Sequence, residues 1–221
     1  MGYVWQFGVI ADYWEVFVRG AIITVQLSVG SALLALVIGL PAGLCRSARS
    51  AWLRIPAVWY IEIIRSTPAL VQIVWIYYCL PILTGIQLGG VLTMILALGL
   101  HAGAFVAEIF RAGINAVDRG QVMASQALGM SYFGAMRRII LPQAVRKMIP
   151  PFINEFASLI KLTTLGSAIA VYELLHESNN LIATAYRPLE VYTFLAVVFF
   201  IIIFPIIKIS QRIEVRLAKR N

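Results

Sequence analysis

Three long stretches of the chain carry no charged side chain, and they constrain the fold more than any other feature. They are residues 20–45, 66–107 and 191–207. A helix rises about 1.5 Å per residue, so about 20 apolar residues cross a hydrocarbon core about 30 Å thick. The chain is 61% hydrophobic and 13% charged, against about 45–50% apolar and about 25% charged in ordinary soluble domains. This composition argues against a water-soluble enzyme and excludes a disordered chain.

The positions of prolines, glycines and charges divide the chain into five expected spans. The run 66–107 is too long for one crossing, and Pro81, Gly85 and Gly89 interrupt it. Pro150 and Pro151 suit the first turn of a new helix. We therefore expect an all-α membrane protein that forms a single transmembrane domain over residues 1–221. Its spans are expected at about 20–45, 56–81, 91–110, 150–172 and 191–211, with a polar segment at about 112–147.

The distribution of cations predicts how these spans are oriented. The net charge is +8, from 18 Lys and Arg against 10 Asp and Glu. With five spans, fourteen of the cations fall on one side: Arg46, Arg49, Arg54, Arg111, Arg119, Arg137, Arg138, Arg146, Lys147, Lys208, Arg212, Arg216, Lys219 and Arg220. Cations that flank spans prefer the cytoplasm, so we expect the N-terminus outside and the C-terminus inside. The charge is then a topology signal and gives no reason to invoke nucleic acid. The first span lacks a cleavable signal pattern and is expected to be retained.

The polar segment predicts two short helices, at residues 121–128 and 132–140. Gly129 suits the end of the first helix, and Ser131 suits the N-cap of the second. Val122, Met123, Ala127 and Leu128 would then be partly exposed, which suggests a docking surface. A pair of amphipathic helices lying on the membrane fits the same periodicity.

A resemblance favours the docking surface. Gly129, followed after nine residues by Ile139-x-Leu141-Pro142, resembles the EAA loop of ABC importer permeases. The three E-A-A positions are Met123-Ala124-Ser125, of which only the alanine matches. Further segments resemble motifs of the polar amino-acid permeases: Arg65-Ser66-Thr67-Pro68, Ala107-Glu108-Ile109-Phe110-Arg111-Ala112-Gly113-Ile114, Leu141-Pro142-Gln143-Ala144, Asn154-Glu155-Phe156 and Tyr186-Arg187-Pro188. The chain is therefore identified as similar to the histidine, arginine, glutamine and opine permease family.

This resemblance implies a type I ABC importer permease fold and a role in ATP-driven import of polar amino acids. The partners it implies are two copies of an ATP-binding subunit, a second permease copy or a related permease, an extracellular or periplasmic solute-binding protein, and the bilayer of a bacterial inner membrane. The expected docking residues for the ATPase are Gln121, Val122, Met123, Ala124, Ala127, Leu128, Gly129, Leu141 and Pro142. An opine-type permease and, more remotely, a carrier outside the ABC class are the alternatives.

The chain itself carries no pattern for catalysis or for a cofactor. No Gly-Lys dipeptide occurs, so the phosphate-binding loop of the common ATPases is excluded. The two cysteines and two histidines lack metal-ligand spacing. We therefore expect a transport subunit that is not an enzyme, with ATP used by a partner.

Ionisable and polar groups inside the expected spans are the candidates for substrate contact. They are Lys161, Thr163, Thr164, Glu108 and His101. An amino acid presents a carboxylate and an ammonium, so a cation with hydroxyl donors and an acid could hold it. His101 could equally be a hydrogen-bonded core residue. The family carries a K-D-T-S-like stretch where this chain has Leu162 after Lys161, and the acid is absent.

Two other groups of charges have simpler interpretations. Glu62 and Arg65 could pair with each other along one helix, and Glu155 could pair with Arg146 or Lys147. Two pairs of glycines, 39 with 43 and 99 with 103, permit close helix packing, either inside one subunit or at a dimer seam.

Overall fold

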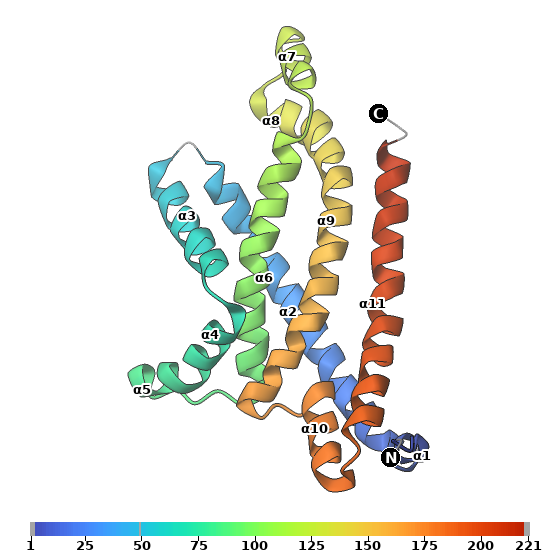
Figure 1. Ribbon diagram of the computed structural model, residues 1–221. Coiled ribbons are helices and arrows are strands. Elements are labelled where there is room, and N and C mark those ends of the chain that lie inside the picture. Colours follow the sequence, from blue (N-terminus) through green and yellow to red (C-terminus); the bar gives the residue numbers. More distant parts are fainter. Residues whose placement is uncertain (1–2, 49, 219–221) are drawn as a thin grey trace.

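The computed structural model describes residues 3–48 and 50–218, and every regular element in these ranges is a helix. The long helices are α2 (Trp14–Arg46), α6 (Gly90–Asn115), α9 (Leu141–Leu162) and α11 (Pro188–Ala218). Figure 1 shows them side by side, with α3 (Ala51–Ser66) flanking them. The remaining elements are α1 (Gly8–Asp12), α4 (Ala69–Val74), η1 (Trp75–Cys79), α5 (Leu80–Thr84), α7 (Arg119–Ala127), α8 (Tyr132–Ala135), η2 (Met136–Ile140), η3 (Thr163–Ile169) and α10 (Leu174–Ala185).

Among the described residues, three helices are long and apolar enough to cross a membrane, and two bent pairs raise the number to as many as five. The three are Trp14–Arg46, Gly90–Asn115 and Pro188–Leu217. They enclose the runs expected at 20–45, 91–110 and 191–211. The bent pairs are Ala51–Ser66 with Ala69–Thr84 and Tyr132–Ile169 with Leu174–Ala185.

The expected helix at 56–81 is broken in the structure. Its two halves meet at an angle of 108° after Ser66. Pro68 has no N–H and forces the residue before it out of the helical region, and Thr67 is accordingly extended, with φ −111° and ψ 139°. Arg65 therefore lies at the end of α3, where the sequence placed it near the start of a span.

The expected start at Pro150 is also wrong. Helix α9 begins at Leu141, with Pro142 in its first turn, and Pro150 and Pro151 lie inside it. Prolines are tolerated inside such helices when the freed backbone groups are satisfied. At this position Ser210 Oγ on α11 donates to the Pro150 carbonyl at 3.1 Å, which ties α9 to α11. The α-helix ends at Leu162, so Lys161 occupies its last turn.

The most extensive helix contact in the described chain joins α2 to α6, and glycines permit it. A Cβ on Gly39 would lie 2.5 Å from the Gly103 carbonyl oxygen, and one on Gly43 would lie 2.8 Å from that of Ala107. A Cβ on Gly99 would lie 2.6 Å from the Leu34 side chain. The small residues thus pack two helices of one subunit together.

Most of the charged segments lie at one end of the helices. The end of α2, the start of α3, helices α7 and α8, and the end of α11 lie together in Figure 1, whereas α1, α5 and α10 lie at the other end. The cation-rich segments therefore lie at the same end of the bundle, as expected from the distribution of Lys and Arg in the sequence. Arg49, Lys219 and Arg220, which were counted in that pattern, lie outside the described residues.

Candidate functional site

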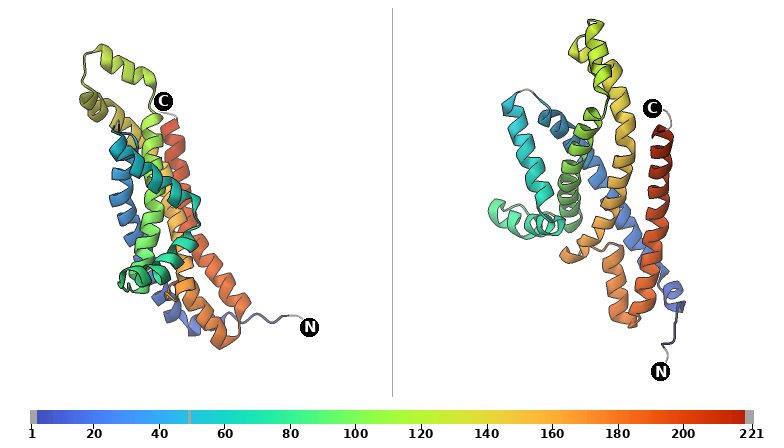
Figure 2. Two further views of the ribbon diagram at one scale, coloured as in Figure 1. Left: turned by 90° about the vertical axis from the view of Figure 1, so that its left-hand side faces the viewer. Right: turned by 45° about the horizontal axis from the view of Figure 1, so that its top comes forward.

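Helices α7 and α8 project beyond the bundle, and local capping defines their ends (Figures 1 and 2). Asp118 accepts a hydrogen bond from the Gly120 N–H at the start of α7, and Ser131 accepts one from Gly134 N at 3.2 Å at the start of α8. Gly129 has φ +72°, and two backbone bonds close the turn: Gly129 N to Gln126 O at 2.9 Å and Met130 N to Ser125 O at 3.0 Å. This is the Schellman pattern of a helix C-terminus, so both predicted caps are confirmed.

The projecting element exposes apolar side chains, as its sequence predicted. Met123 is 63% exposed and Leu128 80% exposed. Val122 is half-buried and packs instead against the cluster around Phe110 and Val117. Of the other expected docking residues, Gln121, Ala124, Ala127, Gly129 and Pro142 are exposed and Leu141 is half-buried in the same cluster.

Two exposed aromatic residues extend this apolar surface and were not anticipated. Tyr132 is 71% and Phe133 is 73% exposed, and both lie at the start of α8. Their position directly after the N-cap Ser131 was the available sequence signal. The apolar surface of the element therefore comprises Met123, Leu128, Tyr132 and Phe133.

The base of this projecting element is fixed to the bundle. Phe110, Val117, Ile140, Ala144 and Met148 form one buried cluster between the end of α6 and the start of α9. The Lys147 ammonium donates to the Ala116 carbonyl across the same junction. Packed side chains thus join the base of α7 to both α6 and α9.

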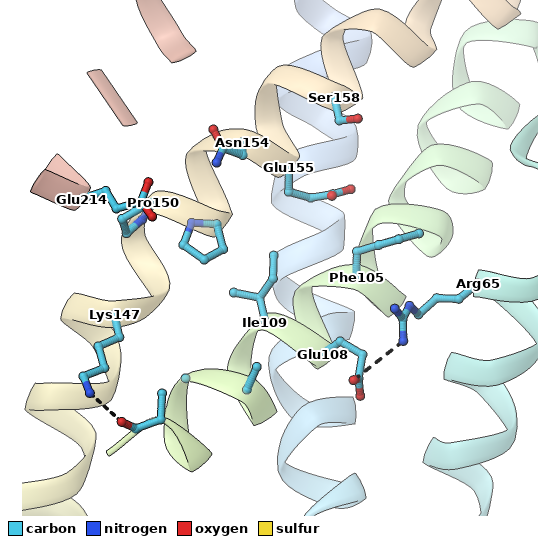
Figure 3. Close-up of a pocket in the computed structure, with 14 residues that line it drawn as sticks. Arg65, Phe105, Glu108, Ile109, Lys147, Pro150, Asn154, Glu155, Ser158 and Glu214 are labelled. Atoms are coloured by element: carbon cyan, nitrogen blue, oxygen red, sulfur yellow. Dashed lines mark hydrogen bonds and ion pairs between the residues drawn. The ribbon is translucent and has the colours of Figure 1, made fainter. Parts of the chain in front are cut away.

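A cavity of about 740 Å³ opens beside this junction, between α3, α6, α9 and the end of α11. Figure 3 shows its wall, with Arg65 and Glu108 on one side and Asn154 and Glu155 on another. It is lined by Arg65, Phe105, Glu108, Ile109, Ala112, Gly113, Ala116, Lys147, Pro150, Pro151, Asn154, Glu155, Ser158 and Glu214. Its wall thus offers both signs of charge.

Glu108 is the centre of an ion cluster that joins three helices. Its carboxylate lies 3.0 Å from Arg111 Nη2, 3.1 Å from Arg46 Nη1 and 3.7 Å from Arg65 Nη1. Arg46 also pairs with Glu62 at 2.9 Å. Glu62 therefore pairs with Arg46 and Arg65 with Glu108, in place of the expected pair between Glu62 and Arg65. The cluster draws α3 and α6 onto the end of α2.

The other expected substrate residues lie away from the cavity. His101 Nδ1 lies 3.2 Å from Gln72 Oε1. The hydroxyls of Thr163 and Thr164 each donate at 2.7 Å to a carbonyl three residues earlier, and Lys161 is exposed. The structure thus places Glu108 in the cavity wall and does not bring the five residues together.

Gln72 explains why His101 sits where it does. Its Nε2 donates to the Ile64 carbonyl at 2.8 Å and to Thr67 Oγ1 at 2.6 Å, while its Oε1 meets His101. These bonds satisfy groups freed by the break between α3 and α4, which would otherwise be costly in an apolar environment. The geometry fits a structural role for His101.

Glu155 has a different environment from the one expected. It lines the cavity, and among the described residues it forms no ion pair with Arg146 or Lys147. Lys147 is engaged with Ala116 instead. Glu155 therefore lines the cavity without the cationic partners that the sequence suggested.

Comparisons with known proteins agree with this architecture. The model of the family described as binding-protein-dependent transport system inner membrane component matches residues 16–220. A putative glutamine transport system permease protein of Rickettsia conorii is 34% identical over 89% of this chain and 90% of its own length. The octopine transport system permease protein of Rhizobium radiobacter is 34% identical over 92% and 88%. A crystal structure of an amino acid ABC transporter with histidines matches with a TM-score of 0.91 and 32% identity, over 97% of this chain and all of that one.

Substituting Gly129 should loosen α7. A side chain in the left-handed region costs about 1–2 kcal/mol, so Gly129→Ala should raise amide hydrogen exchange at the C-terminal turn of α7. Gly89→Ala is the control, because Gly89 has φ −63° and open space around its Cβ position. Equal exchange in the two variants would contradict the role given to Gly129.

Neutralising Glu108 should destabilise the bundle more than neutralising Glu62. Glu108→Gln leaves three guanidinium groups without their shared anion, at a cost of about 1–3 kcal/mol. Glu62→Gln is the matched control, since Glu62 is 53% exposed and pairs with Arg46 alone. The measurement is thermal unfolding in nanodiscs, and a larger loss of Tm in Glu62→Gln would refute the assignment of Glu108 as the centre.

Proposed function

The chain belongs to the family of binding-protein-dependent transport system inner membrane components, and we propose that it is the membrane-spanning permease subunit of an ATP-driven importer of polar amino acids. The observation that carries this proposal is the likeness along nearly the whole chain to amino-acid permeases, in sequence and in fold. The projecting element at α7 and α8, fixed to two long helices, is what such a subunit needs to receive a mechanical push.

The substrate class follows from the relatives. One is named for glutamine and another for octopine, an amino-acid derivative. An opine-type substrate is therefore the second candidate. Both classes present a carboxylate and an amine. The test is to purify the cognate solute-binding protein and measure which amino acids or opines it retains, and then to follow their uptake into proteoliposomes.

Energy would come from a partner. We propose that two copies of an ATP-binding subunit bind and hydrolyse ATP, and that each permease copy inserts the apolar surface of α7 and α8 into a groove on one of them. Exposed apolar side chains on a polar projection favour this contact. The nine expected docking residues, seven of them between Gln121 and Gly129 and the other two Leu141 and Pro142, stay as predictions for that interface.

The cellular placement is proposed on the same basis. The chain would lie in a bacterial inner membrane, with α7 and the C-terminus in the cytoplasm and α1 outside. The separation of cations between the two ends of the bundle supports this orientation. A second permease copy, or a related chain, and a solute-binding protein on the outer side would complete the transporter.

The substrate route is proposed to pass the end of α9. Lys161 is exposed there, with Thr163 and Thr164 in the turn that follows. The cavity beside Glu108 would lie on the exit side of that route. Its mixture of arginine and glutamate side chains matches the two charges of an amino acid. Glu108 itself would act mainly by holding the cluster, since three arginines occupy its carboxylate.

A charge placed on α7 should uncouple the subunit from its ATPase. Met123→Asp sets an anion in the proposed groove, so co-purification of the ATPase and ATP-dependent uptake should both fall. Ile86→Asp is the control, because Ile86 is 59% exposed, close to the 63% of Met123, and follows α5 at the other end of the bundle. Normal co-purification and uptake in Met123→Asp would sink the proposed contact.

An acid restored after Lys161 should change selectivity. Leu162→Asp should raise uptake of cationic amino acids relative to neutral ones, because a carboxylate beside the route attracts a cationic side chain. Leu162→Asn is the matched control, with similar size and no charge. Competition uptake with arginine and glutamine measures the ratio. An unchanged ratio in Leu162→Asp would remove this region from the route.

A further inference from the structure

The residues before the first long helix form a compact segment on the outer end of the bundle. We name Tyr3–Tyr13 the N-terminal segment; it contains α1 and runs directly into α2. It lies beside the first turns of α11, at the end opposite α7 (Figures 1 and 2). None of the functions discussed above uses it.

A single buried carboxylate holds this segment in place. Glu190, in the first turn of α11, is fully buried. It accepts hydrogen bonds from the Tyr3 hydroxyl at 2.5 Å and from the Gln6 N–H at 2.9 Å. Arg187 donates to the Val4 carbonyl at 3.2 Å and lies 3.7 Å from Glu190. A buried charge persists only with such partners, so these contacts fix the segment to α11.

The two sides of the N-terminal segment differ in what they contact. Val9 and Ile10 pack on the buried cluster of Phe17, Leu174, Leu181, Val191 and Leu195. The rings of Tyr3, Trp5 and Phe7 are 48%, 51% and 49% exposed. They form a ladder, with ring centroids 5.5 Å apart between Tyr3 and Trp5 and 5.4 Å apart between Trp5 and Phe7. The protein thus holds three aromatic rings outward.

Helix α2 also carries an exposed apolar stripe. Large exposed side chains recur every three or four residues along α2, at Trp14, Val18, Ile22, Val25, Val29 and Leu33. That spacing is one face of a helix. No other part of the described chain covers this face, and on a helix long and apolar enough to cross a membrane it is suited to contact lipid chains. Residues 3–11 contain no charged side chain, so the ladder adds apolar surface at the end of α2 where the stripe begins, with the exposed Asp12 and Glu15 between the two.

We propose that the N-terminal segment is an interfacial anchor, in which Tyr3, Trp5 and Phe7 lie in the lipid headgroup region at the outer end of the bundle. Trp5 has an apolar ring with a polar N–H, and such side chains favour that depth because one end is apolar and the other wet. Phe7 adds apolar surface beside it, and the Tyr3 hydroxyl is held by Glu190. Glu190 and Arg187 set the depth by tying the segment to the first turn of α11. The anchor couples the start of α2 to the start of α11 through the membrane surface.

Depth-dependent quenching tests the anchor. The chain has five tryptophans, so Trp14, Trp52, Trp59 and Trp75 are replaced by Phe to leave Trp5 as the reporter. The assembled transporter is placed in nanodiscs of phosphatidylethanolamine and phosphatidylglycerol that carry a nitroxide either on the headgroup or at mid-chain. The headgroup nitroxide should remove most Trp5 emission and the mid-chain nitroxide much less. Insensitivity to both lipid-borne quenchers overturns the proposal.

A protein partner is the competing occupant and is tested in the same nanodiscs. Saturating solute-binding protein should leave Trp5 emission and its quenching unchanged. Protection of Trp5 from the headgroup nitroxide by that protein would overturn the lipid assignment in favour of a protein-docking surface.

The role of Glu190 has a matched control. Glu190→Gln, made in the single-tryptophan chain, should broaden the depth profile, because the amide keeps only one of the two acceptor oxygens that Tyr3 and Gln6 use and has no charge to pair with Arg187. Glu15→Gln removes an exposed carboxylate at the same end and should keep the profile. Tyr3→Phe removes only one hydroxyl, so it provides the measurement if Glu190→Gln does not fold. An unchanged profile in Tyr3→Phe and in a folded Glu190→Gln overturns the anchoring role of Glu190.

Discussion

The backbone contact between α2 and α6 is the constraint on which the rest of the structure depends. Lipid gives no hydrophobic advantage to helix pairing, so membrane helices gain by close approach of small residues. Gly39 and Gly43 bring α2 against the carbonyls of Gly103 and Ala107 on α6. The other long helices pack around this pair: α3 and α9 contact α6, and α11 packs on α9.

The pairing also positions the charged end of the bundle. Because α2 and α6 lie close together, Arg46 at the end of α2 reaches Glu108 on α6. Arg65 then adds α3 to the same carboxylate. Beyond the cluster, α6 continues toward α7, so the surface proposed to meet the ATPase and the cavity proposed as an exit share one rigid support. Movement at α7 would therefore reach the cavity without passing through a flexible linker.

Local signals were read well from the sequence, and long-range ones were not. The caps at Gly129 and Ser131 could be predicted because a helix cap depends on residues within one turn. Both predicted caps are confirmed. The expected helix start at Pro150 was wrong: Pro150 and Pro151 lie inside α9, which packs along α6 and α11, and that packing has no local sequence signal. The ion pair of Glu62 with Arg46 could not be predicted from the sequence either, since Arg46 lies on another helix.

The sequence by itself determined that the chain is an apolar helical bundle with cations gathered toward one end, because hydropathy and charge act residue by residue. Its motifs also identified the permease family and the projecting element. Only the tertiary structure decided which predicted site residues meet. In the structure Glu108 lies in the cavity wall, His101 contacts Gln72, and Lys161 is exposed at the end of α9. Those outcomes depend on the crossing of helices far apart in the chain, which no local pattern encodes.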